Sequence, residues 1–100
     1  MINNNKENID AETIEALGLK LTDAPINAAT ALSARVFEYP HLANVYIMES
    51  DLYGNPMPEN SCFLAFNGQH GLMGKHLKME TLKRSTAMDI QKMVEDNNEG

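Results

Sequence analysis

The sequence predicts a small single α+β domain with two N-terminal helices, a central antiparallel sheet of two to three strands and a long C-terminal helix. Three observations lead to this prediction. The length of 100 residues and the hydrophobic content of 43% suit one compact core; helix-start signals precede apolar patterns of helical period; and two central segments alternate as strands do. We expect residues 9–95 to form the domain and the polar ends, 1–8 and 96–100, to be flexible tails.

The first helix is predicted to begin after Asp10 and to end near Gly18. Asp10 has the N-cap position, and Ile9 and Ile14 have the spacing of a hydrophobic staple across that cap. Gly18 has the position of a left-handed C-terminal residue, so Leu19 can fold back onto Ile14 as in a Schellman motif. These paired signals predict a helix of about two to three turns.

A second helix is predicted to begin near Asp23 and to end at Pro40. Pro25 falls in its first turn, where backbone amides have no intrahelical acceptor and proline is tolerated. Apolar residues recur at three- and four-residue steps and form one face, which consists of Ala29, Leu32, Val36 and Tyr39. We expect this face to pack against a sheet or another helix.

Two strands are predicted where the apolar period changes to two. Val45 and Ile47 alternate with Tyr46 and Met48, and the later run 62–66 is apolar on both faces. The second strand is therefore expected to be the more central one, with both of its faces covered.

A two-stranded sheet is marginal by itself, so two ways of completing it stay open. One is a further short strand, near residues 19–21 or near Leu72. The other, which we favour, is a homodimer in which the sheet continues across the subunit interface. A chain of this length buries a modest share of its surface, which also favours self-association.

The last element is predicted to be a helix from Lys75 to about Glu95. One stripe of this helix consists of Met79, Leu82, Thr86, Ile90 and Met93. Thr86 and Asp89 also have the spacing of a capping box, which would restart the helix and break it near Ser85.

Composition narrows the classes of function. The net charge of -6 and the pI near 4.9 argue against nucleic acid as the main ligand, because phosphate binding needs clustered Lys and Arg. The chain has no apolar run that could cross a bilayer and no secretory pattern at its start, so we expect a cytoplasmic protein that does not bind membranes. The single Cys62 forms neither an internal disulfide nor a metal-ligand pair, and we expect no metal or other cofactor.

The most unusual segment is the glycine-rich stretch 67–76, which joins a predicted strand to a predicted helix. Its backbone amides, the helix N-terminus and nearby basic side chains suit an anion such as a nucleotide phosphate. The candidate ligand-binding residues are Gly68, His70, Gly71, Gly74, Lys75 and His76. Their spacing matches neither a P-loop nor a dinucleotide fingerprint, so the alternative is glycines in tight turns beside solvated basic residues.

Catalysis is not expected, because paired catalytic residues do not occur at a recognised spacing. Cys62 and His70 come closest to a nucleophile and its base, but Cys62 falls in an apolar run, where thiols are usually buried and inert. Glu49 and Asp51 flank a strand end, where solvated carboxylates are common.

The candidate partner-binding residues are Tyr53, Met57 and Met88. Tyr53 and Met57 lie in a proline-containing loop that can bind with little loss of entropy, and Met88 lies opposite the apolar stripe of the last helix. The alternative for the loop is that Leu52 and Tyr53 tuck beneath it as a small satellite core.

An acidic surface with spare apolar side chains favours a non-enzymatic protein-interaction module. By analogy of size and charge, we expect a small acidic inhibitor, antagonist or immunity-type protein, such as a phage or bacterial accessory protein, that binds a larger host protein. The alternative is a small-molecule binder that holds a nucleotide or another phosphate anion on residues 68–76.

Overall fold

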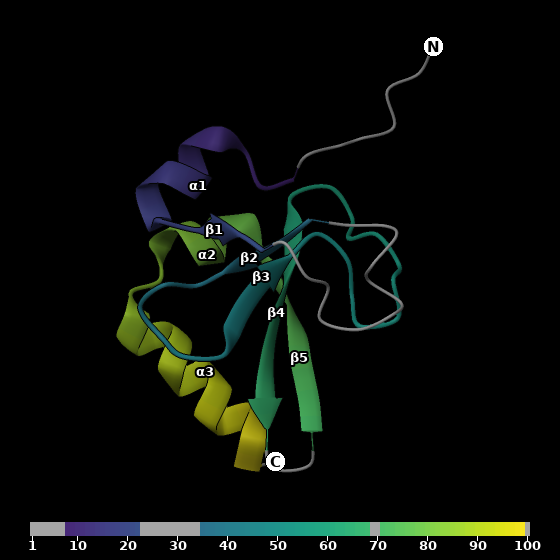
Figure 1. Ribbon diagram of the computed structural model, residues 1–100, viewed down its shortest axis with the longest axis vertical. Coiled ribbons are helices and arrows are strands. Elements are labelled where there is room, and N and C mark those ends of the chain that lie inside the picture. The colour runs from purple at the N-terminus through teal and green to yellow at the C-terminus, as the bar shows by residue number, and fades with distance from the viewer. Residues whose placement is uncertain (1–7, 23–34, 69–70, 100) are drawn as a thin grey trace.

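The computed structural model describes residues 8–22, 35–68 and 71–99. Its elements, in chain order, are α1 (Ala11–Leu17), β1 (Lys20–Leu21), β2 (Val36–Glu38), β3 (Val45–Met48), β4 (Ser61–Gly68), β5 (Gly71–Lys78), α2 (Met79–Arg84) and α3 (Ala87–Glu99). The strands form one five-stranded antiparallel sheet in the order β1-β2-β3-β4-β5, so each strand pairs with its neighbours in sequence (Figure 1).

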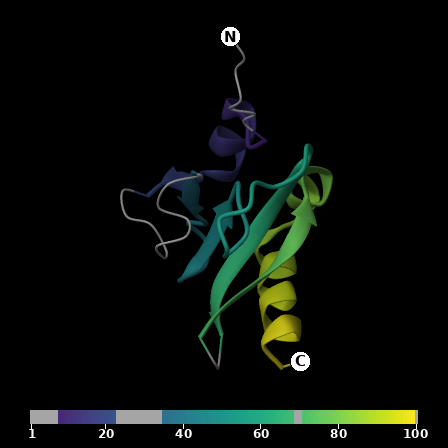
Figure 2. The ribbon, with the colours of Figure 1, turned by 90° about the vertical axis from the view of Figure 1, so that its right-hand side faces the viewer.

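The two faces of this sheet are covered differently. One face, here called the helix-covered face, packs against the helices, and Figure 2 shows α3 behind β4 and β5. Its core consists of Ile9, Leu19, Phe37, Tyr39, Val45, Ile47, Cys62, Leu64, Phe66, Leu77, Met79, Leu82 and Ile90. The opposite face, here called the loop-covered face, holds a smaller cluster of Val36, Met48, Met57, Phe63 and Ala65, with Tyr46 and Leu52 packed against it.

The predicted first helix is confirmed together with its caps. The Asp10 Oδ1 accepts a hydrogen bond from the backbone amide of Thr13 at 2.9 Å. Gly18 has a φ of 68°, in the left-handed region that glycine tolerates, and the Leu19 amide donates to the Ile14 carbonyl at 2.9 Å. The local signals at both ends were therefore sufficient to define α1.

The predicted sheet of two to three strands and the second N-terminal helix are wrong. Residues 36–38, which were assigned to that helix, form β2 and pair with β1 and β3, while residues 23–34 lie outside the described residues. Val36 and Phe37 are both buried, on opposite faces of the sheet. This is the period of a strand, and pairing on both sides outweighed the helical spacing of Val36 and Tyr39.

The additional strands that the sequence allowed are both present, at the two edges of the described sheet. β1 and β5 occupy the two places where the sequence allowed a further strand, residues 19–21 and Leu72. A shared sheet is therefore not needed to complete the fold.

The long C-terminal helix is also wrong at its start, because residues 75–78 belong to β5. The chain then forms α2, leaves helical geometry at Ser85 and resumes as α3, so the break that the sequence left open is present. The capping box is present: the Asp89 amide donates to the Thr86 Oγ1 at 3.2 Å, and the Thr86 amide donates to the Asp89 Oδ2 at 2.9 Å. α3 continues to Glu99, past residue 96, where the tail was expected to begin.

The segment before α1 is fixed to the sheet by three polar side chains. The Arg35 guanidinium donates to both carboxylate oxygens of Glu49, at 2.8 and 2.9 Å, and also to the Ile9 carbonyl at 2.8 Å. Glu49 in turn accepts from the Ile9 amide at 2.9 Å. The Asn8 side-chain amide donates to three carbonyls at the end of the β3–β4 connection, those of Met57, Pro58 and Ser61. These bonds hold one end of that connection in place.

Candidate partner-binding surface

The connection between β3 and β4 contains a compact turn at residues 51–55, here called the Tyr53 turn, which is built around the Asp51 carboxylate. The Asp51 Oδ1 accepts from the backbone amides of Tyr53 and Asn55, both at 2.9 Å, and its Oδ2 accepts from the Asn55 side chain at 3.1 Å. The Asp51 amide donates to the Asn55 carbonyl at 2.9 Å. Gly54 has a φ of 88°, which glycine adopts without steric strain. The backbone of the turn is thus fixed by its own hydrogen bonds.

The electrostatics of Asp51 agree with this geometry. Burial by itself would raise the pKa of Asp51, but the hydrogen bonds from Asn55 and Tyr53 stabilise the carboxylate and bring the pKa below its ordinary value. The charge of His76 acts in the same direction.

The aromatic side chain of Tyr53 is 83% exposed, whereas its neighbour Leu52 packs against the small cluster of the loop-covered face. The predicted satellite core therefore holds for Leu52 and not for Tyr53. A β-bridge between Ser50 and Pro56 closes the base of the turn. Tyr53 is thus a large apolar group presented on an ordered backbone, a combination that lowers the entropy lost on binding.

The three predicted partner-binding residues are not brought together. Met88, on α3, is 80% exposed and lies on the helix-covered side of the molecule. Met57 is 8% exposed and forms part of the cluster beneath the connection, because the chain folds back over the sheet after the turn. Tyr53 and Met88 are both exposed on ordered backbone, on opposite sides of the sheet, and the ring of Tyr53 is the more rigid side chain. The exposed Leu21 on β1, at 54%, was missed, since so short a strand has no visible period.

The glycine-rich segment forms the β4–β5 hairpin and not a loop before a helix, which corrects its expected structure. Gly68 pairs with Gly71, and Gly74 and Lys75 lie within β5 opposite Ala65 and Leu64. Successive residues of a strand point to opposite faces, so Lys75 and His76 diverge. His70 lies outside the described residues. The strand-to-helix geometry on which the anion hypothesis depended is absent from the described part of this segment.

Gly74 has a packing role on the loop-covered face. A Cβ added at Gly74 would overlap the ring of Phe63 and would lie 2.6 Å from the Leu64 carbonyl oxygen. The Phe63 ring also meets the His76 ring edge to face, with centroids 5.4 Å apart. Phe63 therefore covers the middle of β5, and a side chain at position 74 would displace it.

β5 is the outer strand at one edge of the described sheet, and it is eight residues long. The strand at the opposite edge, β1, has two residues. In an antiparallel pair every second residue directs its amide and carbonyl away from its neighbour, so β5 offers a row of backbone groups beyond β4. Its charged or ionisable side chains are Lys75, His76 and Lys78, so it is a basic strand in an acidic chain.

Cys62 is fully buried in β4, as the apolar run predicted. Burial raises the pKa of the Cys62 thiol to about 12, and the negative charge of Glu49 adds to the shift. The thiol is therefore protonated at neutral pH and is a poor nucleophile. Within the described ranges, His, Cys, Asp and Glu form no group of three that could hold a metal ion.

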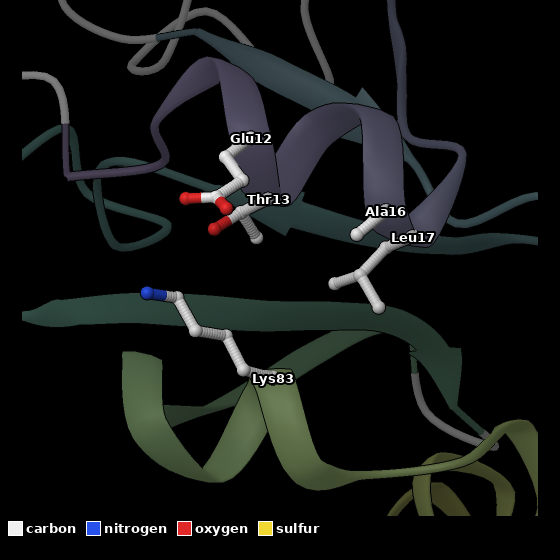
Figure 3. Close-up of a pocket in the computed structure, with 5 residues that line it drawn as sticks. All are labelled: Glu12, Thr13, Ala16, Leu17 and Lys83. Carbon is white, nitrogen blue, oxygen red and sulfur yellow. The ribbon is translucent and has the colours of Figure 1, made fainter.

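The described helices are all too short or too polar to traverse a membrane. A pocket of about 320 Å³ lies between α1 and α2, and its lining residues are Glu12, Thr13, Ala16, Leu17 and Lys83. Figure 3 shows Glu12 and Lys83 on opposite walls, with the apolar Ala16 and Leu17 further along. This lining supplies two opposite charges and a small apolar patch, without an activated nucleophile.

Comparison with known proteins assigns no family. Neither a protein-family model, nor a curated protein, nor a solved structure matches this chain. The geometry of the described residues is therefore the basis for the proposed function.

Proposed function

We propose that this chain is a non-enzymatic protein-interaction module, of the inhibitor or antagonist type, that binds a larger protein through the Tyr53 turn. The observation that carries the proposal is the 83% exposure of Tyr53 on a turn whose backbone is fixed by Asp51. Tyrosine is enriched among the residues that dominate binding energy, because a rigid ring buries a large area and its hydroxyl can still form a hydrogen bond.

The surroundings of the turn favour a particular kind of partner surface. The connection, residues 49–60, holds three acidic residues and no basic one: Glu49, which is paired with Arg35, Asp51 and the exposed Glu59. A partner with an apolar pocket for the Tyr53 ring and basic groups at its rim would complement this surface. The net charge of -6 would also speed the encounter with a basic protein at low salt.

Two observations on the described residues favour binding over catalysis. Cys62 is buried and keeps its proton at neutral pH. The pocket between α1 and α2 has a single carboxylate, Glu12, and a single amine, Lys83, and neither has a partner that would activate it for acid–base work.

The proposal is tested by capture from a lysate of the source organism, with quantitative mass spectrometry of the bound proteins. The bait is compared with Tyr53→Ala and with the matched control Met88→Ala, which removes an equally exposed apolar side chain on the other side of the sheet. We expect at least one protein to bind the wild type and Met88→Ala, and to be depleted about tenfold or more on Tyr53→Ala.

Two results would overturn the proposal. One is that every captured protein is bound equally well by Tyr53→Ala. The other is that a phosphorylated small molecule and no protein accompanies the purified chain. Circular dichroism of the three baits, which should melt alike because both substituted side chains are exposed, excludes a loss of folding as the cause.

A further inference from the structure

We propose that two copies of this chain associate through β5, antiparallel across a two-fold axis at Gly74, so that their sheets join into one continuous sheet. This inference goes beyond the proposed function, because it concerns the strand edge and a second copy, and it does not use Tyr53.

The starting observation is the difference between the two edges of the sheet. A short edge strand such as β1 offers little to pair with, whereas an outer strand of eight residues is a template for another strand. Figure 2 shows no described strand beyond β5, and α3 lies behind the face of the sheet and not across its plane. Its outward backbone amides and carbonyls can therefore be satisfied by a strand of a second copy.

Symmetry restricts how β5 can pair with itself. In a two-fold pair residue i of one copy faces residue j of the other, and j faces i. Facing residues lie on the same face of the joined sheet, and faces alternate along a strand, so i and j differ by an even number. The axis must therefore pass through a residue and not between two residues.

Two registers give the longest overlap within β5. An axis at Gly74 pairs residues 71–77 with each other, and an axis at Lys75 pairs residues 72–78; axes at 73 or 76 give shorter overlaps. The axis at Lys75 sets Lys75 directly against its own copy, and like charges that face each other destabilise a sheet. The axis at Gly74 has no facing pair of like charges. The repulsion between the two Lys75 side chains therefore favours the Gly74 register over the Lys75 register.

The facing residues in the Gly74 register are compatible on both sides of the sheet. On the helix-covered face Met73 faces Lys75 of the second copy, where the lysine stem can pack against the thioether. On the loop-covered face Leu72 faces His76, and Gly74 faces Gly74 at the axis. Glycine within a strand often marks a place where another backbone approaches closely, which fits the position of this axis.

The test is sedimentation velocity of the full chain over a range of micromolar concentrations, with three variants. Met73→Lys sets two lysines opposite two lysines in the Gly74 register, and we expect it to weaken the dimer by about tenfold or more. Adding Lys75→Glu to Met73→Lys converts both repulsive pairs into attractive ones and should restore association. Met88→Lys adds the same charge on the exposed side of α3 and should leave the dimer unchanged.

If Met73→Lys weakened the dimer only by disturbing folding, the double variant would not recover, because it carries the same lysine next to the core. Recovery of the double variant therefore separates charge repulsion from a folding defect. A wild-type chain that stays monomeric at about 100 µM, a dimer that Met73→Lys does not weaken, or a double variant that does not recover would each overturn the proposal. Tyr53→Ala should dimerise as the wild type does, so this result is separate from the outcome of the partner capture.

Discussion

On the helix-covered face, side chains of the central strands meet side chains from the helices, and Leu64, Leu82 and Ile90 are completely buried there. On the loop-covered face, the described cover consists of Leu52 and Met57 from a single connection. The helix-covered face therefore holds most of the buried apolar residues, and the exposed Tyr53 and His76 lie on the loop-covered side. The helix-covered face can stabilise the fold while the loop-covered side carries a binding surface, because the two roles use different residues.

The largest expected effect is a difference in stability between the two faces. Leu82→Ala should lower the free energy of unfolding by about 3 to 5 kcal/mol, because its cavity is enclosed by strands and helices that cannot collapse into it. Met57→Ala should lower it by about 2 kcal/mol or less, since the connection above it can settle. Urea unfolding of both variants measures the difference, and equal losses would mean that the faces contribute alike.

The next effect concerns the packing of the loop-covered face at Gly74. Gly74→Ala should lower the free energy of unfolding by about 1 to 3 kcal/mol, because the new methyl group overlaps the Phe63 ring. Combining it with Phe63→Leu should remove the part of this loss that comes from the ring, while the clash with the Leu64 carbonyl oxygen remains, and a double-mutant cycle in urea isolates that part. If the two losses simply add, the ring is not what requires glycine at position 74.

The parts of the fold that the sequence predicted are those with local signals. α1 has its cap and its C-terminal glycine within a few residues, and the break before α3 follows from Thr86 and Asp89. β3 and β4 have a clear period of two. Each of these signals acts between residues that are neighbours in sequence, so the pattern and the structure coincide.

β2 and β5 were missed because a strand is stabilised by partners far along the chain. Residues 36–38 form a strand because they pair with β1 and β3, although their apolar spacing partly matches a helix. β5 is an outer strand with glycines and basic residues, and it has no apolar alternation to recognise. The dimerisation edge could not be proposed until 75–78 was known to be strand.

The candidate surface was predicted in part. Tyr53 was named, whereas the burial of Met57 depends on how the connection folds over the sheet, which its composition does not reveal. The role of Asp51 had a signal in its own sequence, because an aspartate followed by Gly54 and Asn55 is typical of a turn closed by the carboxylate.

The smallest expected effect is the pH dependence of the Tyr53 turn. Because the folded turn lowers the pKa of Asp51 below 3.8, its carboxylate stabilises the turn fully above that value, and the stabilisation is lost as the pH falls through the lowered pKa. The amides of Tyr53 and Asn55 should therefore lose protection from hydrogen exchange, relative to their intrinsic rates, as the pH falls below 3.8. The effect should be modest, because the turn is exposed to solvent.

The Asp51→Asn variant separates this carboxylate from general acid unfolding. An asparagine Oδ1 can still accept the two backbone bonds, but the bond from the Asn55 side chain and the negative charge are lost. Protection at Tyr53 should therefore be lower than in the wild type near neutral pH and should no longer change in acid. Amides of β4 serve as the internal reference, since their bonds lie within the sheet on both sides. Equal acid sensitivity of the Tyr53 amide in both proteins would mean that Asp51 does not hold the turn. The small loss of entropy expected when Tyr53 binds a partner would then have no structural basis.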